Sequence, residues 1–249
     1  MQKNLTKFIT KLAHNMGYSV LPLWKLEDES FAKHLAKVFI HYKIKTVLDI
    51  GANQGQYRDF LRERVGFSGT IHSFEPIPHL AEEMRTRSKN DPKWHVHNIA
   101  LGSSSGDLAL NVMARNTFSS FRDPSPTSLT VKEFSAGNSI VEKITVPVHR
   151  LDDFISNCID VSLKSTYLKI DTQGFDIEVI RGALNFLELV PAMQFELAIQ
   201  RLYENVPDYY SMLKTVESLG FEISGFFPIS NDKSLRAVEF DCVMVRQVN

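Results

Sequence analysis

The residues best suited to chemistry follow one short apolar run of the sequence, Thr46–Ile50. Asp49 lies inside the run, and Gly51, Asn53 and Gly55 come directly after it. Glycines let a ligand approach the backbone closely, and the start of a following helix favours a negative group. Open α/β sheets bind ligands beyond the carboxyl ends of their strands, at turns of this kind. We therefore expect the turn to hold a nucleotide-sized ligand.

The spacing of the glycines separates two classes of cofactor. A dinucleotide fingerprint reads G-x-G-x-x-G, but Asn53 and Gln56 stand where its second and third glycines belong. Those glycines serve the approach of a pyrophosphate and close helix packing. S-adenosylmethionine has no pyrophosphate, so a looser glycine pattern with an acid near its amine suits it better. The predicted cofactor residues of this turn are Asp49, Gly51, Ala52, Asn53, Gly55 and Gln56.

A second acid follows the next apolar run, 70–74. Glu75, with Pro76 after it, is placed where a carboxylate accepts hydrogen bonds from two ribose hydroxyls. NAD enzymes use the same contact, so Glu75 indicates an adenosine without naming the cofactor. Asn98 and Ala100, after the third run, are candidates to line the adenine or belong to an ordinary strand end. The alternative for Asp49 and Glu75 is that both only cap helices.

Short apolar runs alternate with helical periods, which predicts a mostly parallel sheet with right-handed crossovers. The pattern is interrupted by two alternating segments, 108–112 and 144–148, which predict an antiparallel pair. The long segment between them, 114–139, is predicted to be a substrate-facing lid or a disordered loop. The expected strands of the main sheet are 46–50, 70–74, 94–100, 167–171, 193–197, 221–227 and 238–245, the last two as a hairpin.

The N-terminal segment, residues 1–43, is predicted to be a helical cover without chemistry of its own, and residues 44–249 the cofactor-binding domain. Apolar side chains from Phe31 to Tyr42 recur on one helical face, with Asp28 as the expected cap.

Composition limits the partners. Lys and Arg number 28 against 29 Asp and Glu, a net charge of −1, which gives no basic face for nucleic acid. No run of about 18 apolar residues occurs, so no transmembrane helix is expected. The absence of a disulfide pattern favours the cytoplasm. The oligomeric state is left open.

Several blocks, in order, resemble the FkbM family of methyltransferases. They are VLDIGANQG at 47–55, FEP at 74–76, ALG at 100–102, LDDF at 151–154, LKIDTQGFD at 168–176, FEL at 195–197 and FDCVMVR at 240–246. The resemblance implies an α/β, Rossmann-like class I methyltransferase fold, with a seven-stranded, mostly parallel sheet and an antiparallel last strand. It also implies S-adenosylmethionine as cofactor and methylation of a hydroxyl on a sugar, glycan or secondary metabolite. His149-Arg150 and Asp176 depart from the usual family pattern and leave substrate details open.

Two acids at later strand ends are candidates for catalysis. A sugar hydroxyl is a poor nucleophile, with a pKa on the order of 15, so a general base helps. Asp171 is the expected base and Glu196, on the neighbouring strand, its partner. Two carboxylates close together raise the pKa of one of them, which suits a base. The alternatives are that the pair holds a divalent cation or that Asp171 only caps the next turn.

The competing functions are an NAD(P)-dependent oxidoreductase and a non-catalytic protein that binds S-adenosylmethionine. The acceptor is a small molecule or glycan that the sequence does not identify. The aromatic-bearing loop 114–139 and the segment 200–210, with Tyr203, Tyr209 and Tyr210, are candidates for a sugar-stacking wall. The alternative is a partly buried helix and its lead-in.

Overall fold

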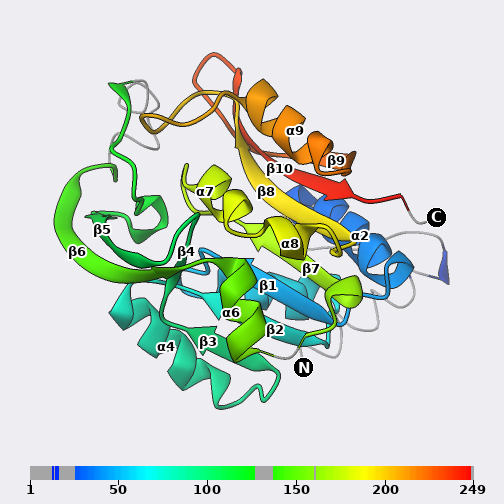
Figure 1. Cartoon of the computed structure of the whole chain (residues 1–249). Coiled ribbons are helices and arrows are strands. Elements are labelled where there is room, and N and C mark those ends of the chain that lie inside the picture. The colour runs from blue at the N-terminus through cyan, green and yellow to red at the C-terminus, as the bar shows by residue number, and fades with distance from the viewer. Residues whose placement is uncertain (1–12, 14, 17–25, 127–136, 160, 248–249) are drawn as a thin grey trace, which may run out of the picture.

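The computed structural model describes residues 13, 15, 16, 26–126, 137–159 and 161–247. The first expected N-terminal helix and Phe134 of the expected lid lie outside these residues. Figure 1 shows a twisted central sheet between two layers of helices, with a smaller sheet beside it.

The central sheet has seven strands in the order β3-β2-β1-β7-β8-β10-β9. All neighbours pair in parallel until β10, which runs antiparallel to both β8 and β9. The expected class I fold, with its antiparallel last strand, is therefore confirmed. The strands are β1 (Thr46–Ile50), β2 (Thr70–Phe74), β3 (Trp94–His97), β7 (Thr166–Ile170), β8 (Ala192–Ala198), β9 (Glu222–Asn231) and β10 (Ala237–Val245).

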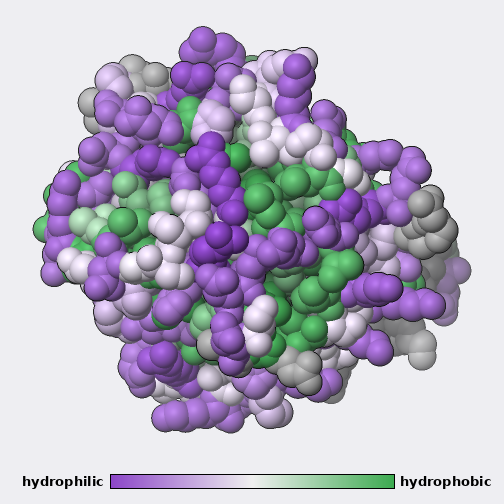
Figure 2. Space-filling model, viewed as in Figure 1, coloured by the Kyte–Doolittle hydropathy of each residue, from purple (hydrophilic) through white to green (hydrophobic). Residues whose placement is uncertain are grey.

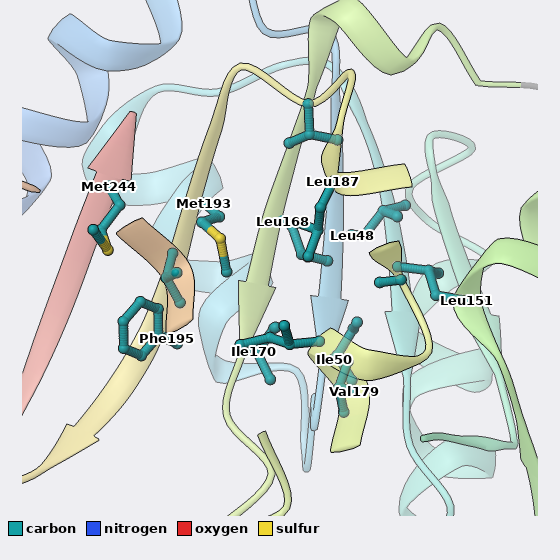
Figure 3. Packing of buried hydrophobic residues seen from close by; sticks show 14 of the residues in the cluster. Leu48, Ile50, Leu151, Leu168, Ile170, Val179, Leu187, Met193, Phe195 and Met244 are labelled. Atoms are coloured by element: carbon teal, nitrogen blue, oxygen red, sulfur yellow. The ribbon is translucent and has the colours of Figure 1, made fainter. Parts of the chain in front are cut away.

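One face of this sheet is covered by the C-terminal helices. Strands of a parallel sheet are buried on both faces, which explains why β1 and β7 are apolar and buried almost throughout. Leu48, Ile50, Leu168 and Ile170 point from these strands into the layer of helices, as Figure 3 shows. The helices on this face are α6 (Leu151–Cys158), α7 (Asp176–Arg181), α8 (Leu184–Leu187) and α9 (Tyr209–Ser218).

The other face is covered by α2 (Leu26–His41), α3 (Gln56–Phe60) with the π-helical turn Leu61–Val65, and α4 (Pro78–Ser88). Leu35, Val38 and Phe39 of α2 are buried against this face, as the apolar periodicity predicts. Asp28 is not the expected cap, because the helix already begins at Leu26.

The smaller sheet consists of β4 (Ala100–Leu101), β6 (Ile140–His149) and β5 (Gly106–Met113), in that order. β5 and β6 form the expected antiparallel pair. The expected strand 94–100 is corrected: it ends at His97, and Ala100 belongs to the smaller sheet. The chain turns at Asn98 because its amide Nδ2 donates to the carbonyls of Glu75 and Pro76, at 2.9 and 3.0 Å.

The surface is largely hydrophilic, with hydrophobic side chains gathered near α8 on the face seen in Figure 2. Among the residues described by the structure, no helix has the length and apolar character needed to cross a membrane.

Candidate active site

A pocket of about 420 Å³ lies at the carboxyl edge of the central sheet. It is lined from the ends of β1, β2 and β7, from β8 and β10, from α2 and α3, and from the segment after β5. Of the predicted residues, it brings together Gly51, Ala52, Asn53, Gln56, Glu75, Pro76, Ala100 and Asp171.

The turn after β1 depends on a glycine at position 51. Gly51 has φ +77°, and a Cβ there would lie 1.8 Å from the carbonyl oxygen of Asp171. The backbone N–H groups of Gly51 and Ala52 both donate to the carbonyl of Phe74, at 3.1 and 3.0 Å. The turn is thereby fixed against the ends of both neighbouring strands.

Gly55 lies behind the pocket lining. It precedes α3 with φ +82°, and a Cβ there would lie 2.8 Å from the Trp94 ring. It is not among the pocket-lining residues. Gly55 therefore serves the close packing of α3 on β3, and its cofactor contact stays a prediction.

Asp49 is also placed behind the pocket. Its carboxylate is fully buried, 3.0 Å from the ammonium of Lys169, and accepts a hydrogen bond from Ser73 Oγ at 3.2 Å. Lys169 Nζ also donates to the Gly51 carbonyl, at 3.2 Å, and lies 3.4 Å from Asp171. Burial works to lower the pKa of Lys169, but Asp49 and Asp171 outweigh it and hold that pKa above its usual range. Lys169 lines the pocket and Asp49 does not, so Asp49 acts on the pocket through Lys169.

Glu75 lies at the other end of the pocket and is 4% exposed. Its Oε2 accepts from the Asn53 N–H and its Oε1 from the Ile77 N–H, both at 2.8 Å. Burial raises the pKa of Glu75 to about 7, although these two hydrogen bonds oppose the shift. Because each carboxylate oxygen has a second acceptor site, Glu75 can still accept hydrogen bonds from two adjacent hydroxyls.

The wall beside Glu75 is apolar. Pro76, Ile77, Ile99, Ala100 and Leu101 line it. Asn98 is not part of the lining, because its side chain is turned to the backbone of Glu75 and Pro76. Asn98 thus braces this turn from outside the lining, and its contact with an adenine stays a prediction.

Asp171 is joined to Glu196 through a residue that the sequence did not single out. Gln173 Nε2 donates to Asp171 Oδ1 at 3.0 Å and to Glu196 Oε2 at 2.8 Å. The hydroxyl of Tyr203 donates to Gln173 Oε1 at 2.8 Å, and Ser120 Oγ donates to the Gln173 carbonyl at 2.6 Å. Gln173 has φ +52°, a conformation that costs a non-glycine residue about 1–3 kcal/mol. These contacts hold it there.

Glu196, the expected partner of Asp171, does not line the main pocket and reaches Asp171 only through Gln173. It lines a separate cavity of about 40 Å³ under α9. Burial raises the pKa of Glu196, and the neighbouring charges of Glu239 and Asp171 raise it further. Within the described ranges, no three His, Cys, Asp or Glu side chains are grouped so that they could hold a metal ion.

A polar network lies at the end of the pocket that β8 and β10 form. Gln194 Nε2 donates to Asp241 at 2.7 Å, and its Oε1 accepts from the hydroxyls of Tyr57, at 2.8 Å, and Tyr167, at 3.3 Å. Burial raises the pKa of Asp241 to about 6, against the opposing effect of its hydrogen bond from Gln194. Polar residues inside otherwise apolar strands were the available signal for Gln194 and Asp241.

The segment after β5 reaches the pocket through Asn116, Thr117 and Ser119–Phe121. Tyr203 is buried, while Tyr209 and Tyr210 are exposed, and none of the three lines the pocket. The predicted aromatic wall is therefore not formed by these tyrosines.

Comparison with known proteins adds a family to this geometry. The family described as "Methyltransferase FkbM domain" matches residues 49–223. Hexuronic acid methyltransferase AglP of Haloferax volcanii is 22% identical over 175 residues, covering 69% of this chain and 64% of its own length. The chain therefore spans less than two thirds of this relative.

The fold is also similar to a solved structure. Methyltransferase FkbM from Methylobacillus flagellatus matches with a TM-score of 0.51 and 15% identity, over 81% of this chain and 43% of that one. Its similarity supports the class I architecture. Because the family match covers most of the sequence, the chain belongs to the FkbM methyltransferase domain family.

Proposed function

We propose that the protein is an S-adenosylmethionine-dependent methyltransferase that acts on a hydroxyl of a sugar, glycan or secondary metabolite. The observation that carries this proposal is the position of Glu75, the Gly51 turn and Asp171 around one pocket, at the ends of three adjacent strands. The Haloferax relative is named for a hexuronate, so the acceptor classes to distinguish for this chain are sugars with and without a carboxylate.

The pocket residues fit the cofactor. Glu75 has acceptor sites left for the two ribose hydroxyls, and the apolar wall of Ile77, Ile99 and Leu101 suits a flat base. Two of the glycines that serve a pyrophosphate are missing, which favours this cofactor over NAD(P).

Asp171 is the proposed general base. The bound cofactor would supply a methyl group activated on a sulfonium. Asp171 is 37% exposed within the pocket lining, where it can accept the proton that an acceptor hydroxyl loses. Gln173 orients this carboxylate through a hydrogen bond of 3.0 Å, and the Lys169 ammonium lies 3.4 Å from it. Orientation of this kind supplies much of the rate in a displacement reaction.

Calorimetric titration tests the cofactor assignment. We expect S-adenosylmethionine and S-adenosylhomocysteine to bind and NADH not to bind. At pH 7 binding should release up to about half a proton, because ribose hydroxyls donate to ionised Glu75, whose pKa lies near 7 in the free protein. Buffers of different ionisation enthalpy measure this release.

Glu75→Gln is the matched variant. We expect it to weaken S-adenosylmethionine binding by about 10- to 100-fold, the usual worth of hydrogen bonds to a charged group, and to abolish the proton release. Binding of NADH alone would contradict the cofactor assignment.

Asp171→Asn tests catalysis separately. It should retain cofactor affinity while S-adenosylhomocysteine formation falls by about 100-fold or more in an acceptor screen. Full transfer by this variant would disprove the base assignment. If no acceptor class gave turnover while the cofactor bound, the non-catalytic alternative would gain support.

A further inference from the structure

Resting on the proposed function, we propose that the β8–β10 end of the pocket selects acceptors without a carboxylate. Asp241 accepts hydrogen bonds from the hydroxyls or amine of a neutral or amino sugar, and its charge excludes a uronate. The residue would therefore determine acceptor specificity.

The location of Asp241 separates it from the cofactor end. Across the sheet, the order β2-β1-β7-β8-β10 takes the pocket from Glu75, past Gly51 and Asp171, to Asp241. Neighbouring strands lie about 4.8 Å apart, so β10 is about 14 Å from the strand that carries the glycine turn. An acceptor that approaches Asp171 from this side meets Asp241.

The neighbours of Asp241 hold it in one orientation. The amide of Gln194 has one orientation: its Oε1 accepts from the hydroxyls of Tyr57 and Tyr167, so its Nε2 is the atom that faces Asp241 and donates to it. Asp241 Oδ1 takes the donor, and no group in the described part of the chain forms a hydrogen bond with Oδ2. A pocket-lining carboxylate is thus fixed with one oxygen left for a ligand that donates hydrogen bonds.

The charges of the lining point the same way. Glu75, Asp171 and Asp241 all contribute carboxylates to it. The cation that the described lining provides, Lys169, is 6% exposed and already lies between Asp49 and Asp171. An acceptor carboxylate near Asp241 would face like charge, whereas a hydroxyl or an ammonium would be bound.

The aromatic residues of the lining suit a sugar ring. Phe31, Tyr57 and Phe60 line it from α2 and α3, and the rings of Phe31 and Phe60 stack with centroids 5.2 Å apart. Aromatic surfaces pack against the C–H face of a pyranose and also attract cations. A ring placed there presents its polar edge to Asp241 and Gln194.

The test is binding of matched methyl glycosides of glucose, glucosamine and glucuronic acid to the protein loaded with S-adenosylhomocysteine, at pH 7.5. We expect the glucoside and the glucosaminide to bind at least about 10-fold more tightly than the glucuronide. Asp241→Asn should reduce this ratio to below about 3-fold without changing affinity for S-adenosylhomocysteine. The exposed Asp107, on β5 and outside the pocket, provides the matched control Asp107→Asn, which should keep the wild-type ratio.

The outcomes separate the two proposals. Failure to bind S-adenosylhomocysteine would defeat the proposed function. If S-adenosylhomocysteine bound normally and the glucuronide bound as tightly as the other sugars or more tightly, only the proposed selection against carboxylates would be overturned. Failure of all three sugars to bind would overturn it too. An unchanged ratio in Asp241→Asn would remove Asp241 from the assignment. If that variant did not fold, the wild-type ratio would still decide whether the pocket excludes carboxylates.

Discussion

At the level of single residues, the cofactor turn depends on a close contact between two backbones. Gly51 and the carbonyl of Asp171 leave no room for a side chain. The same contact places the proposed base beside the turn, so one glycine sets the distance between the cofactor end and the catalytic end of the pocket.

Gly51→Ala should therefore destabilise the protein by more than about 3 kcal/mol, since it adds both a steric clash and an unfavourable φ. Gly66→Ala is the control: Gly66 has φ +76° but nothing within 4 Å of its Cβ position, so about 1 kcal/mol is expected. Urea unfolding of both variants measures the difference. Equal losses would show that the contact with Asp171 relaxes without cost.

Gln173 offers a second test at this scale. Gln173→Met removes the amide between Asp171 and Glu196, and kcat should fall by about 10- to 100-fold with cofactor affinity changed less than about 3-fold. Glu196→Gln keeps an acceptor for the amide and should change kcat by less than about 3-fold. A loss in Glu196→Gln as large as that in Gln173→Met would mean that the Glu196 carboxylate itself takes part.

The residue types at the site were predictable, but their assignment to cavities was not. Glu75, Gly51 and Asp171 could be found because they directly follow apolar runs. Asp49 and Glu196 lie inside such runs and point away from the main pocket, into an ion pair with Lys169 and into a separate cavity. That outcome depends on contacts between distant strands, which a local pattern does not contain.

At the level of elements, β2 and β3 share an unusual stack of histidines. His72 and His97 lie with ring centroids 5.3 Å apart, and His72 Nδ1 is 3.1 Å from His97 Nε2. Burial lowers the pKa of His72 to about 3 and that of His97 to about 4, and neighbouring histidines lower both further. Both rings are therefore neutral in the folded protein near pH 7.

This stack should make stability fall as pH falls. In the unfolded chain these two histidines take up protons below about pH 6.5, whereas in the folded chain they do so only near pH 4 and 3. Each histidine therefore lowers the free energy of unfolding by on the order of 2 kcal/mol between pH 7.5 and pH 5. His97→Phe should lessen this loss and His79→Gln, an exposed position of α4, should not. Urea unfolding at both pH values measures it, and an unchanged loss in His97→Phe would contradict the assignment.

The elements themselves were largely predictable, because strands buried on both faces have continuous apolar runs. β1 and β2 have the expected bounds. The end of β3 was missed because the turn at Asn98 depends on hydrogen bonds to Glu75 and Pro76, on another strand end. The π-helical turn Leu61–Val65, which continues α3, has no sequence signal that we recognise.

At the level of the whole molecule, we propose that the helical cover and the cofactor-binding domain unfold together. Leu35 of α2 is fully buried in the same cluster as Val47 and Tyr167 of the sheet, and Phe31 packs on Phe60 of α3. Residue 43 then divides two parts of the sequence that belong to one cooperatively unfolding unit.

Leu35→Ala should lower the free energy of unfolding by about 2–5 kcal/mol, the usual cost of such a cavity, while the protein keeps a single unfolding transition. Circular dichroism reports on helix content and tryptophan fluorescence on Trp24 and Trp94, and both should give the same midpoint. Ile40→Ala, at an exposed position of the same helix, should cost less than about 1 kcal/mol. Separate midpoints in Leu35→Ala would instead show that α2 melts independently.

The antiparallel direction of β10 has an evolutionary consequence. Because Glu239 pairs with Ala198 at the end of β8, the loop between Asn231 and Ala237 lies at the same edge of the sheet as the pocket. The cofactor turns follow β1 and β2, on the opposite half. Insertions and deletions in this hairpin can therefore alter the acceptor side while the cofactor side is inherited unchanged, so one scaffold can diversify its substrates without having to find its cofactor again.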